Sequence, residues 1–481
     1  MKKVLFAAAE GVPFYKTGGL GDVIYALPKT LVQNPELDVR IVLPYYAHLM
    51  PEEYQTQLEE LTHFEIQVGW QKVYVGVKTL VLNEVRYYFI DNLTYFGRDG
   101  LYGYWDDGER FGFFQMAIIE MLEKIDFIPD VLQINDWHTA FIPVLLKDKY
   151  SWRSALQNIK TVLTIHNLKF QGIYDPMILD TVFGIGRQFF NEQGFQFYDQ
   201  VNFLKGGIQF ADKVTTVSPS YAQEIQTPEF GEQLDGVLRV NSYKLAGFLN
   251  GIDTVLYDPM TDKRINHNYN FKTIAKKAEN KHELQEALSL PVSDDPLYIV
   301  VSRLTRQKGM DILLGAMANF LVRHNAQMII LGTGDRDLEL DFGWMQNRFP
   351  GQLSVNIRFD ETFAQQMYSA ADFILIPSAF EPSGLSQMMG MRYGTVPIVH
   401  ETGGLRDSVA PFNEYTNEGT GFSFVEFSSG TLEGILNYSY QTYREKPKLY
   451  RGIVQRDMAA DFSWAKSSEL YVGMYRELLG C

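Results

Sequence analysis

Short apolar segments recur along the chain, separated by stretches long enough to form helices. They occupy residues 39–43, 131–134, 161–165, 213–217, 298–302, 328–331, 373–377 and 396–399. Continuous apolar strands that alternate with helices are typical of parallel sheets that are covered on both faces. The pattern therefore predicts an α/β fold.

A polar region divides the chain into two halves, each with its own series of strands and helices. It begins at Asn250 and continues through an Asn- and Lys-rich stretch at residues 266–281. We therefore expect one domain over residues 1–255 and a second from 256 onward. Segments 64–68, 73–77 and 85–90 have no helices between them, which predicts an antiparallel excursion within the first domain.

Charge and composition exclude several classes of partner. The chain has 43 Lys and Arg against 58 Asp and Glu, a formal charge of −15, which disfavours nucleic acid. Its apolar runs are too short to cross a bilayer, and the short run before Glu10 is typical of a strand rather than a signal peptide. The single cysteine, Cys481, is consistent with a cytoplasmic location.

The sequence T-G-G-L-x-D occurs twice, at residues 17–22 and 402–407. Paired glycines let backbone N–H groups approach a ligand closely, and such loops commonly bind phosphate at helix starts. Lys16 precedes the first copy, whereas Glu401 precedes the second, so the two are not a duplicated site. They predict glycine-lined loops that approach one ligand from two domains.

Polar or glycine-rich groups follow many of the predicted strands. Ligands of open parallel sheets bind beyond the carboxyl ends of the strands, so these groups predict a deep cleft between two Rossmann-like, doubly wound domains. For His166 three roles stay open, namely general base, sugar-binding donor and structural histidine. The strand-end groups are Lys16, Asp136, His138, His166, Arg303, Lys308, Gly332, Gly334, Glu381 and His400.

Two cations and one carboxylate stand out in the second half. Arg303 offers a planar fork and Lys308 a point charge, and together they can neutralise a diphosphate. Residues 383–386 are expected to open a helix whose free N–H groups bind an anion. Glu381 either caps that helix or accepts hydrogen bonds from sugar hydroxyls. We favour the second role, because a carboxylate beside an anion needs another partner.

A D-x-D sequence, Asp335-Arg336-Asp337, could in principle hold a metal ion. It follows a Gly-Thr-Gly turn and is expected in the first turn of a helix, where acidic residues interact favourably with the dipole without a metal. We expect no metal and no cofactor. The sequence also has no H-E-x-x-H, G-x-S-x-G or cysteine cluster.

Taken together, these motifs resemble those of the bacterial glycogen synthases and plant starch synthases. The resemblance extends nearly end to end and in order. It is carried by K-T-G-G-L-G-D from Lys16, D-W-H from Asp136, T-I-H-N from Thr164, L-N-G-I-D from Leu249, S-R-L from Ser302, K-G from Lys308, G-T-G-D from Gly332, F-E-P-S-G-L from Phe380 and T-G-G-L from Thr402.

The resemblance implies the GT-B architecture and transfer of α-glucose from ADP-glucose to a glycogen or α-1,4-glucan end, with retention. It implies a C-terminal domain over residues 256–460 and a last segment, 461–481, that crosses back to the first domain. The expected catalytic residues are Lys16, Asp136, His166, Arg303, Lys308 and Glu381. The expected donor-binding residues are Gly18, Gly19, Asp22, Asn250, Gly332, Gly334, Phe359, Ser383, Gly384, Leu385, Ser386, Thr402 and Gly403.

Three positions depart from the family pattern. Phe359 stands where the family often has Tyr, so stacking on adenine is retained but a hydroxyl is lost. Ser383 replaces a frequent Cys, and Lys169-Phe170 replaces a more usual Ala-Tyr, which puts acceptor contacts in doubt.

Other functions remain open at this point. They are a UDP-sugar transferase, a nucleotide-sugar epimerase, a phosphorylase with a cofactor-bearing lysine, and a glucan-binding module without activity. The oligomeric state does not follow from the sequence.

Overall fold

The computed structural model describes residues 1–480, so Cys481 lies outside the described residues. The chain forms two compact units. Met1–Phe248 and the segment from Trp464 onward make up the N-terminal unit, and Leu249–Ser463 makes up the C-terminal unit. Both are α/β units built on largely parallel sheets, which confirms the predicted fold class.

The N-terminal unit contains a nine-stranded sheet in the order β12-β11-β7-β6-β1-β2-β5-β4-β3. In the part of the sheet with the order β12-β11-β7-β6-β1-β2-β5, all neighbouring strands run parallel. Strand β4 is antiparallel to both β3 and β5, as predicted for the excursion. Its strands are β1 (Lys2–Ala7), β2 (Leu37–Pro44), β3 (Glu59–Val68), β4 (Gln71–Leu82), β5 (Val85–Asp91), β6 (Val131–Asn135), β7 (Lys160–Ile165), β11 (Lys213–Thr216) and β12 (Leu245–Gly247).

Helices cover this sheet, and a small antiparallel sheet in the order β8-β10-β9 lies in the same unit. Its strands are β8 (Ile173–Tyr174), β9 (Gln196–Phe197) and β10 (Gln200–Asn202). The helices are α1 (Gly19–Leu31), α2 (Glu52–Gln55), α3 (Leu93–Phe96), α4 (Asp107–Lys124), α5 (Ile142–Lys147), α6 (Phe203–Phe210), α7 (Pro219–Glu224), α8 (Asp235–Val240) and α17 (Trp464–Leu479).

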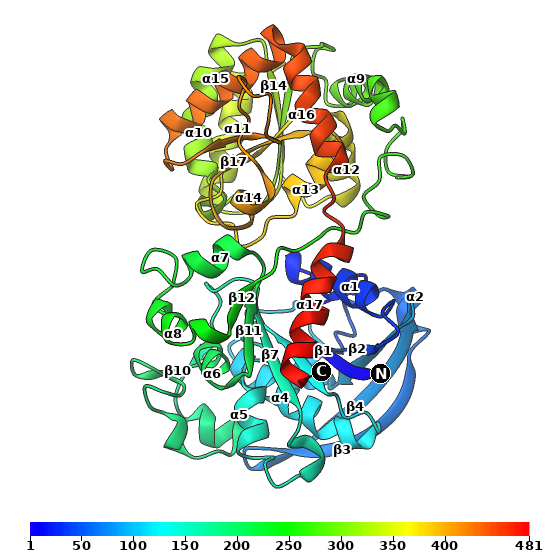
Figure 1. The fold of residues 1–481 in the computed structure, drawn as a ribbon, viewed down its shortest axis with the longest axis vertical. Helices are drawn as coiled ribbons and strands as arrows, with labels where there is room; N and C mark the ends of the chain where they lie inside the picture. Colours follow the sequence, from blue (N-terminus) through cyan, green and yellow to red (C-terminus); the bar gives the residue numbers. More distant parts are fainter. Residues whose placement is uncertain (481) are drawn as a thin grey trace. The chain divides into compact units, whose positions relative to one another are not determined.

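The last helix, α17, packs within the N-terminal unit. Figure 1 shows it in red beside α1 in blue. Trp464, Tyr471 and Tyr475 are buried in the core of this unit, and the Tyr475 hydroxyl donates to Gln133 Oε1 at 3.1 Å. The chain therefore returns to the unit in which it began.

The C-terminal unit contains an all-parallel, six-stranded sheet in the order β15-β14-β13-β16-β17-β18. Its strands are β13 (Leu297–Val301), β14 (Gln327–Leu331), β15 (Leu353–Asn356), β16 (Phe373–Ile376), β17 (Val396–His400) and β18 (Phe422–Phe424). Its helices are α9 (Lys277–Ala287), α10 (Met310–Arg323), α11 (Arg336–Arg348), α12 (Glu361–Ala370), α13 (Ser386–Arg392), α14 (Gly403–Ser408), α15 (Ser429–Glu445) and α16 (Pro447–Ala459).

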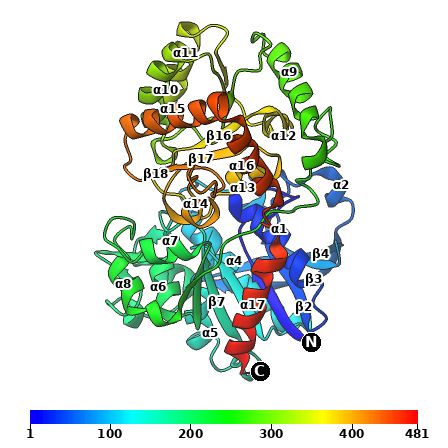
Figure 2. The same ribbon diagram turned by 45° about the horizontal axis from the view of Figure 1, so that its top comes forward.

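Alternate residues of these strands face two separate cores, because side chains alternate across a strand. Tyr298 and Val300 pack with α10, α11 and α15, whereas Leu297 and Ile299 pack with α9, α12 and α13. Figure 2 shows the two groups of helices on opposite faces of the sheet. This is the reason that the strands appear as continuous apolar runs in the sequence.

Both sheets reverse their strand order at a central pair of strands. The order is reversed between β1 and β6 in the N-terminal unit and between β13 and β16 in the C-terminal unit. In doubly wound sheets, ligands bind beyond the carboxyl ends of the strands at such switch points. The segments that follow β1, β6, β13 and β16 are therefore the first places to look for a site.

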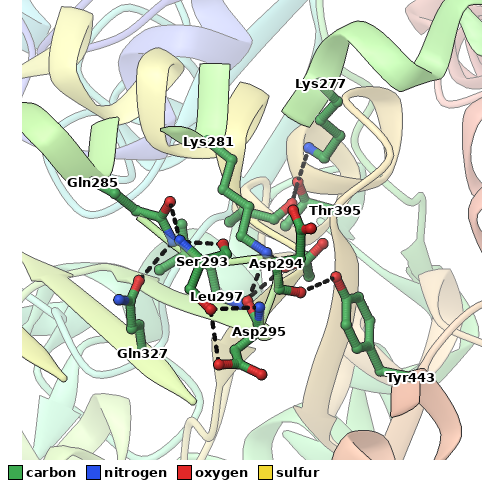
Figure 3. Close-up of polar contacts among 12 residues, drawn as sticks. Lys277, Lys281, Gln285, Ser293, Asp294, Asp295, Leu297, Gln327, Thr395 and Tyr443 are labelled. Atoms are coloured by element: carbon green, nitrogen blue, oxygen red, sulfur yellow. Dashed lines mark hydrogen bonds and ion pairs between the residues drawn. The ribbon is translucent and has the colours of Figure 1, made fainter. Parts of the chain in front are cut away.

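Helix α9 is held to its unit largely by polar side chains (Figure 3). Its buried positions include Lys277, Lys281 and Gln285, which are spaced so that they share one helix face. Lys277 Nζ donates to the carbonyl oxygens of Tyr368 and Tyr393 at 2.9 and 3.0 Å, and burial lowers its pKa to about 7. The lack of an apolar stripe on α9 is thus compensated by hydrogen bonds to the sheet and its loops.

Lys281 and Asp372 form the charged contact of this helix, and the pair yields a stability prediction. Lys281 Nζ lies 2.8 Å from Asp372 Oδ2, and both side chains are largely buried. Lys281→Met leaves the Asp372 carboxylate without its cation, so we expect a loss of about 3 kcal/mol in the free energy of unfolding. Calorimetry or urea unfolding measures it, with the exposed Lys276→Met as the matched control. Equal stability of the two variants would contradict the prediction.

Candidate functional site

In the N-terminal unit, the segment after β1 forms a compact loop around a buried carboxylate, Glu10. Glu10 Oε2 accepts the backbone N–H and the hydroxyl of Thr17 at 2.9 and 2.8 Å. Glu10 Oε1 accepts the Gly21 N–H at 3.1 Å, and Tyr102 donates its hydroxyl to Oε2 at 3.2 Å. One carboxylate thus holds both ends of the segment that contains the first T-G-G-L.

The same loop carries Lys16, whose Nζ lies 3.1 Å from Asp22 Oδ1. Both side chains are partly exposed, and residues 17–19 are exposed at the start of α1. The loop therefore presents a cation and the beginning of a helix at the same place, a combination that favours an anion.

Sequence reasoning did not identify Glu10 as a functional residue. Burial raises the pKa of its carboxyl, although the hydrogen bonds from Thr17, Gly21 and Tyr102 oppose the rise. The sequence did contain a signal for this residue. Glu10 directly follows the apolar run of the first strand and precedes a glycine-rich loop, which is an unusual place for a charged side chain.

Two polar residues, Asn135 and Asp136, stand where β6 ends. Asp136 has a left-handed backbone, with φ of 55°, and its Oδ1 accepts the backbone N–H of His166 at 2.7 Å. Burial raises the pKa of Asp136 to about 7, even though backbone N–H groups of His166 and Asn167 lower it. This carboxyl therefore titrates near neutral pH at the switch point of the sheet.

Two histidines flank Asp136 and both are neutral. Burial lowers the pKa of His166 to about 3, and burial together with Arg110 lowers that of His138 to about 3. His166 Nε2 lies 2.9 Å from Asn135 Oδ1. His138 packs against Trp137, which is buried in the core.

In the C-terminal unit, the segments after β13 and β16 meet at an ion pair. Lys308 Nζ lies 2.6 Å from Glu381 Oε2, and the same oxygen accepts the Ser378 hydroxyl at 2.9 Å. Glu381 is buried and Lys308 partly so. Arg303 is exposed, and within residues 1–480 its guanidinium has no ion-pair partner. The segment after β13 thus carries an exposed cation, Arg303, and a second cation, Lys308, that is paired with Glu381.

The segment 383–386 begins a helix later than the sequence predicted. Helix α13 starts at Ser386, so residues 383–385 form a turn ahead of it rather than its first turn. Gly384 has a φ of 64°, and Gln387 Nε2 donates to the carbonyl oxygens of Ser383 and Gly384 at 3.2 and 3.0 Å. The reason is the left-handed residue, which a regular helical turn does not contain.

Close backbone packing explains two glycines of this unit, Gly334 after β14 and Gly404 after β17. A Cβ on Gly404 would lie 2.0 Å from the backbone carbonyl oxygen of Ser383. The N–H of Gly404 donates to the backbone carbonyl oxygen of Glu381 at 3.0 Å. A Cβ on Gly334 would lie 2.1 Å from the Leu304 oxygen, and its N–H donates to Glu339 Oε1 at 2.8 Å. Both N–H groups therefore have a hydrogen-bond partner within this unit.

Asp335 and Asp337 lie at the start of α11, as predicted, and both face Arg306. Asp337 Oδ2 lies 2.6 Å and Asp335 Oδ2 3.9 Å from that guanidinium. Among the described residues, no group of three His, Cys, Asp or Glu side chains is placed to hold a metal ion.

The remaining predicted donor-binding residues differ in exposure. Phe359 is 78% exposed ahead of α12, whereas Asn250 and Thr402 are buried. In the described part of the chain, no helix is both long and apolar enough to cross a membrane.

Comparison with known proteins agrees with this arrangement. The family model "Starch synthase catalytic domain" matches residues 3–240, and "Glycosyl transferases group 1" matches residues 281–440. The glycogen synthase of Lactiplantibacillus plantarum is 58% identical over 479 residues and that of Streptococcus sanguinis 52% identical over 478 residues. The first alignment covers 100% of both chains, and the second 99% of this chain and 100% of the relative.

A solved structure of a related protein has the same architecture. The catalytic domain of starch synthase IV from Arabidopsis thaliana, bound to ADP and acarbose, superposes with a TM-score of 0.92 at 32% identity. The match covers 100% of this chain and 99% of that one. The chain therefore belongs to the family of bacterial glycogen synthases and starch synthases, which are GT-B glycosyltransferases.

Proposed function

We propose that the chain transfers α-glucose from ADP-glucose to the non-reducing end of an α-1,4-glucan, with retention of configuration, in the cytoplasm. The observation that carries the proposal is the full-length identity of 58% to a protein named glycogen synthase. Further support comes from the related starch synthase, whose structure holds ADP and acarbose.

The chemistry places definite demands on the site. The bond between C1 of glucose and the diphosphate oxygen breaks, and a bond forms between C1 and the 4-hydroxyl oxygen of the glucan. Positive charge develops on the sugar ring and negative charge on the diphosphate. Preorganised cations aimed at that developing charge are expected to give the largest catalytic contribution. The proton of the acceptor hydroxyl passes to the departing phosphate, and attack on the face of C1 that the diphosphate leaves retains the configuration without a covalent Asp or Glu intermediate.

In this proposal, Lys16, Arg303 and Lys308 bind the diphosphate of the donor. Glu381 and the turn at 383–386 bind glucose and phosphate. Phe359 stacks on the adenine of the donor.

On the acceptor side, the proposal assigns Asp136, His166 and Asn250 to the glucose and the incoming glucan. Asp136 and His166 share a hydrogen bond at the end of β6 and β7. His166 is neutral near pH 7, so it can hydrogen-bond hydroxyls without adding a cation that would compete for the diphosphate.

One assay tests the proposal against its alternatives. ADP-glucose and UDP-glucose are supplied to the full chain, each with and without glycogen and with and without EDTA, and nucleotide release is measured. We expect ADP release that requires glycogen and is unchanged by EDTA. Preference for UDP-glucose, turnover without glucan or strict metal dependence would each contradict the proposal. Glucan binding without nucleotide release would point to a non-catalytic module.

A further inference from the structure

We propose that Asn135 is a positioning residue that fixes His166 as its Nε2–H tautomer, so that Nδ1 accepts a hydrogen bond from a substrate hydroxyl. That the hydroxyl belongs to a sugar rests on the proposed function. The tautomer itself is inferred from hydrogen bonds within the protein and is independent of that function.

The orientation of the Asn135 amide is set by two carbonyl groups. Asn135 is the last residue of β6 and is 2% exposed. Its Nδ2 donates to the Ala7 oxygen at 3.0 Å, on the neighbouring strand β1, and to the Gln133 oxygen at 3.3 Å. Only the NH₂ group of an amide can donate to a carbonyl oxygen. The Oδ1 atom must therefore point the other way, towards His166.

The amide orientation in turn determines where the imidazole carries its proton. Asn135 Oδ1 can only accept a hydrogen bond, and His166 Nε2 lies 2.9 Å from it. Nε2 must therefore carry hydrogen. Because burial keeps this imidazole neutral, the ring has a single N–H, and Nδ1 is left with a lone pair.

The ring is also held in position along the chain. The backbone N–H of His166 donates to Asp136 Oδ1 at 2.7 Å, directly after β7. Within residues 1–480 no donor or acceptor contacts Nδ1, and Nδ1 is absent from the buried unpartnered atoms, so solvent or a ligand can contact it. An accepting nitrogen at the carboxyl end of a parallel strand selects a ligand that donates, such as a hydroxyl.

Asn135 thus acts through His166 rather than by touching the substrate. If the amide were replaced by an aliphatic side chain, the neutral imidazole could place its proton on Nδ1 instead. The ring would then present a donor instead of an acceptor, so the substrate hydroxyl would have to turn its own hydrogen away and accept from Nδ1.

Histidine-selective ¹⁵N labelling of the full chain tests the tautomer directly. The chain has 8 histidines, and His166→Gln assigns the signal by its loss. In long-range ¹H–¹⁵N spectra at pH 7 we expect a protonated Nε2 and an unprotonated Nδ1 for His166. A protonated Nδ1 or an imidazolium in the wild-type protein would overturn the proposal, and this measurement needs no variant of Asn135 to fold.

Asn135→Ala then tests the role of the amide, with Gln133→Ala as matched control. Gln133 is equally buried on β6 and its amide bonds Thr164 and Tyr475, but it does not contact His166. We expect Asn135→Ala to shift the His166 signals towards the Nδ1–H form and to lower kcat/KM by about 10²-fold. Gln133→Ala should leave the tautomer unchanged. An unshifted His166 in Asn135→Ala would refute the positioning role, whereas a shifted tautomer in that variant, combined with no glucosyl transfer by the wild-type protein, would refute only the proposed function.

Discussion

Lys16→Ala lowers the rate of glucosyl transfer by about 10³-fold while the chain stays folded, if the loop after β1 binds the diphosphate as proposed. The cation stands beside the exposed residues 17–19 at the start of α1, where negative charge from the departing diphosphate would be stabilised both by Lys16 and by the helix. The Glu10 carboxylate holds the backbone at Thr17, directly after Lys16, and at Gly21, so the loop remains in place when the side chain of Lys16 is shortened.

The expected loss of rate depends on the position of the Lys16 charge at the start of α1, and not on the net charge of the protein. Lys29→Ala removes the same charge from the last turn of the same helix and serves as the matched control. Asp22→Asn removes the acidic partner of Lys16. Because a partly exposed ion pair contributes little free energy, we expect Lys16 to stay in place and the rate of glucosyl transfer to fall by less than about tenfold. Steady-state kinetics with ADP-glucose and glycogen, together with circular dichroism, measure all three. A near-normal rate for Lys16→Ala would contradict its role.

The fold was predictable because its strands are buried on both faces. In the C-terminal unit, Tyr298 and Ile299 are neighbours that face opposite cores, so both faces of the strand are covered and its residues form a continuous, largely apolar run. The antiparallel excursion was predictable for a different reason, because β3, β4 and β5 follow one another without helices. Local pattern was enough in both cases. The polar attachment of α9 was not predictable, since partners such as Asp372 are far away in the sequence.

The candidate site was predictable at the level of strand ends but not at the level of hydrogen bonds. Asp136 and His166 each follow a strand, and the structure joins them by a backbone hydrogen bond. The roles of Glu10 and Asn135 depend on contacts with β1, α1 and Tyr102, which no local pattern encodes. Glycine pairs were also ambiguous, because Gly404 is required by close packing on Ser383 and not by a ligand alone.

Glu381 gives the second large expected effect, and a double-mutant cycle with Lys308 separates two explanations of it. Glu381 accepts hydrogen bonds from both Lys308 and Ser378. If it only holds Lys308 in place, Glu381→Gln should have no further effect once Lys308 has been replaced by methionine. If it also accepts hydrogen bonds from glucose hydroxyls, as we propose, the loss should persist in the Lys308→Met background.

We expect Glu381→Gln alone to lower kcat/KM by about 10³-fold, because a buried carboxylate binds a hydroxyl more strongly than a neutral amide and because Lys308 loses its anion. In the Lys308→Met background we expect a further loss of at least about tenfold. Glutamine preserves the size of the side chain, so thermal unfolding should change little relative to the rate. If the double variant is only as slow as Lys308→Met, Glu381 is a positioning residue for that lysine, and its proposed contact with glucose is wrong.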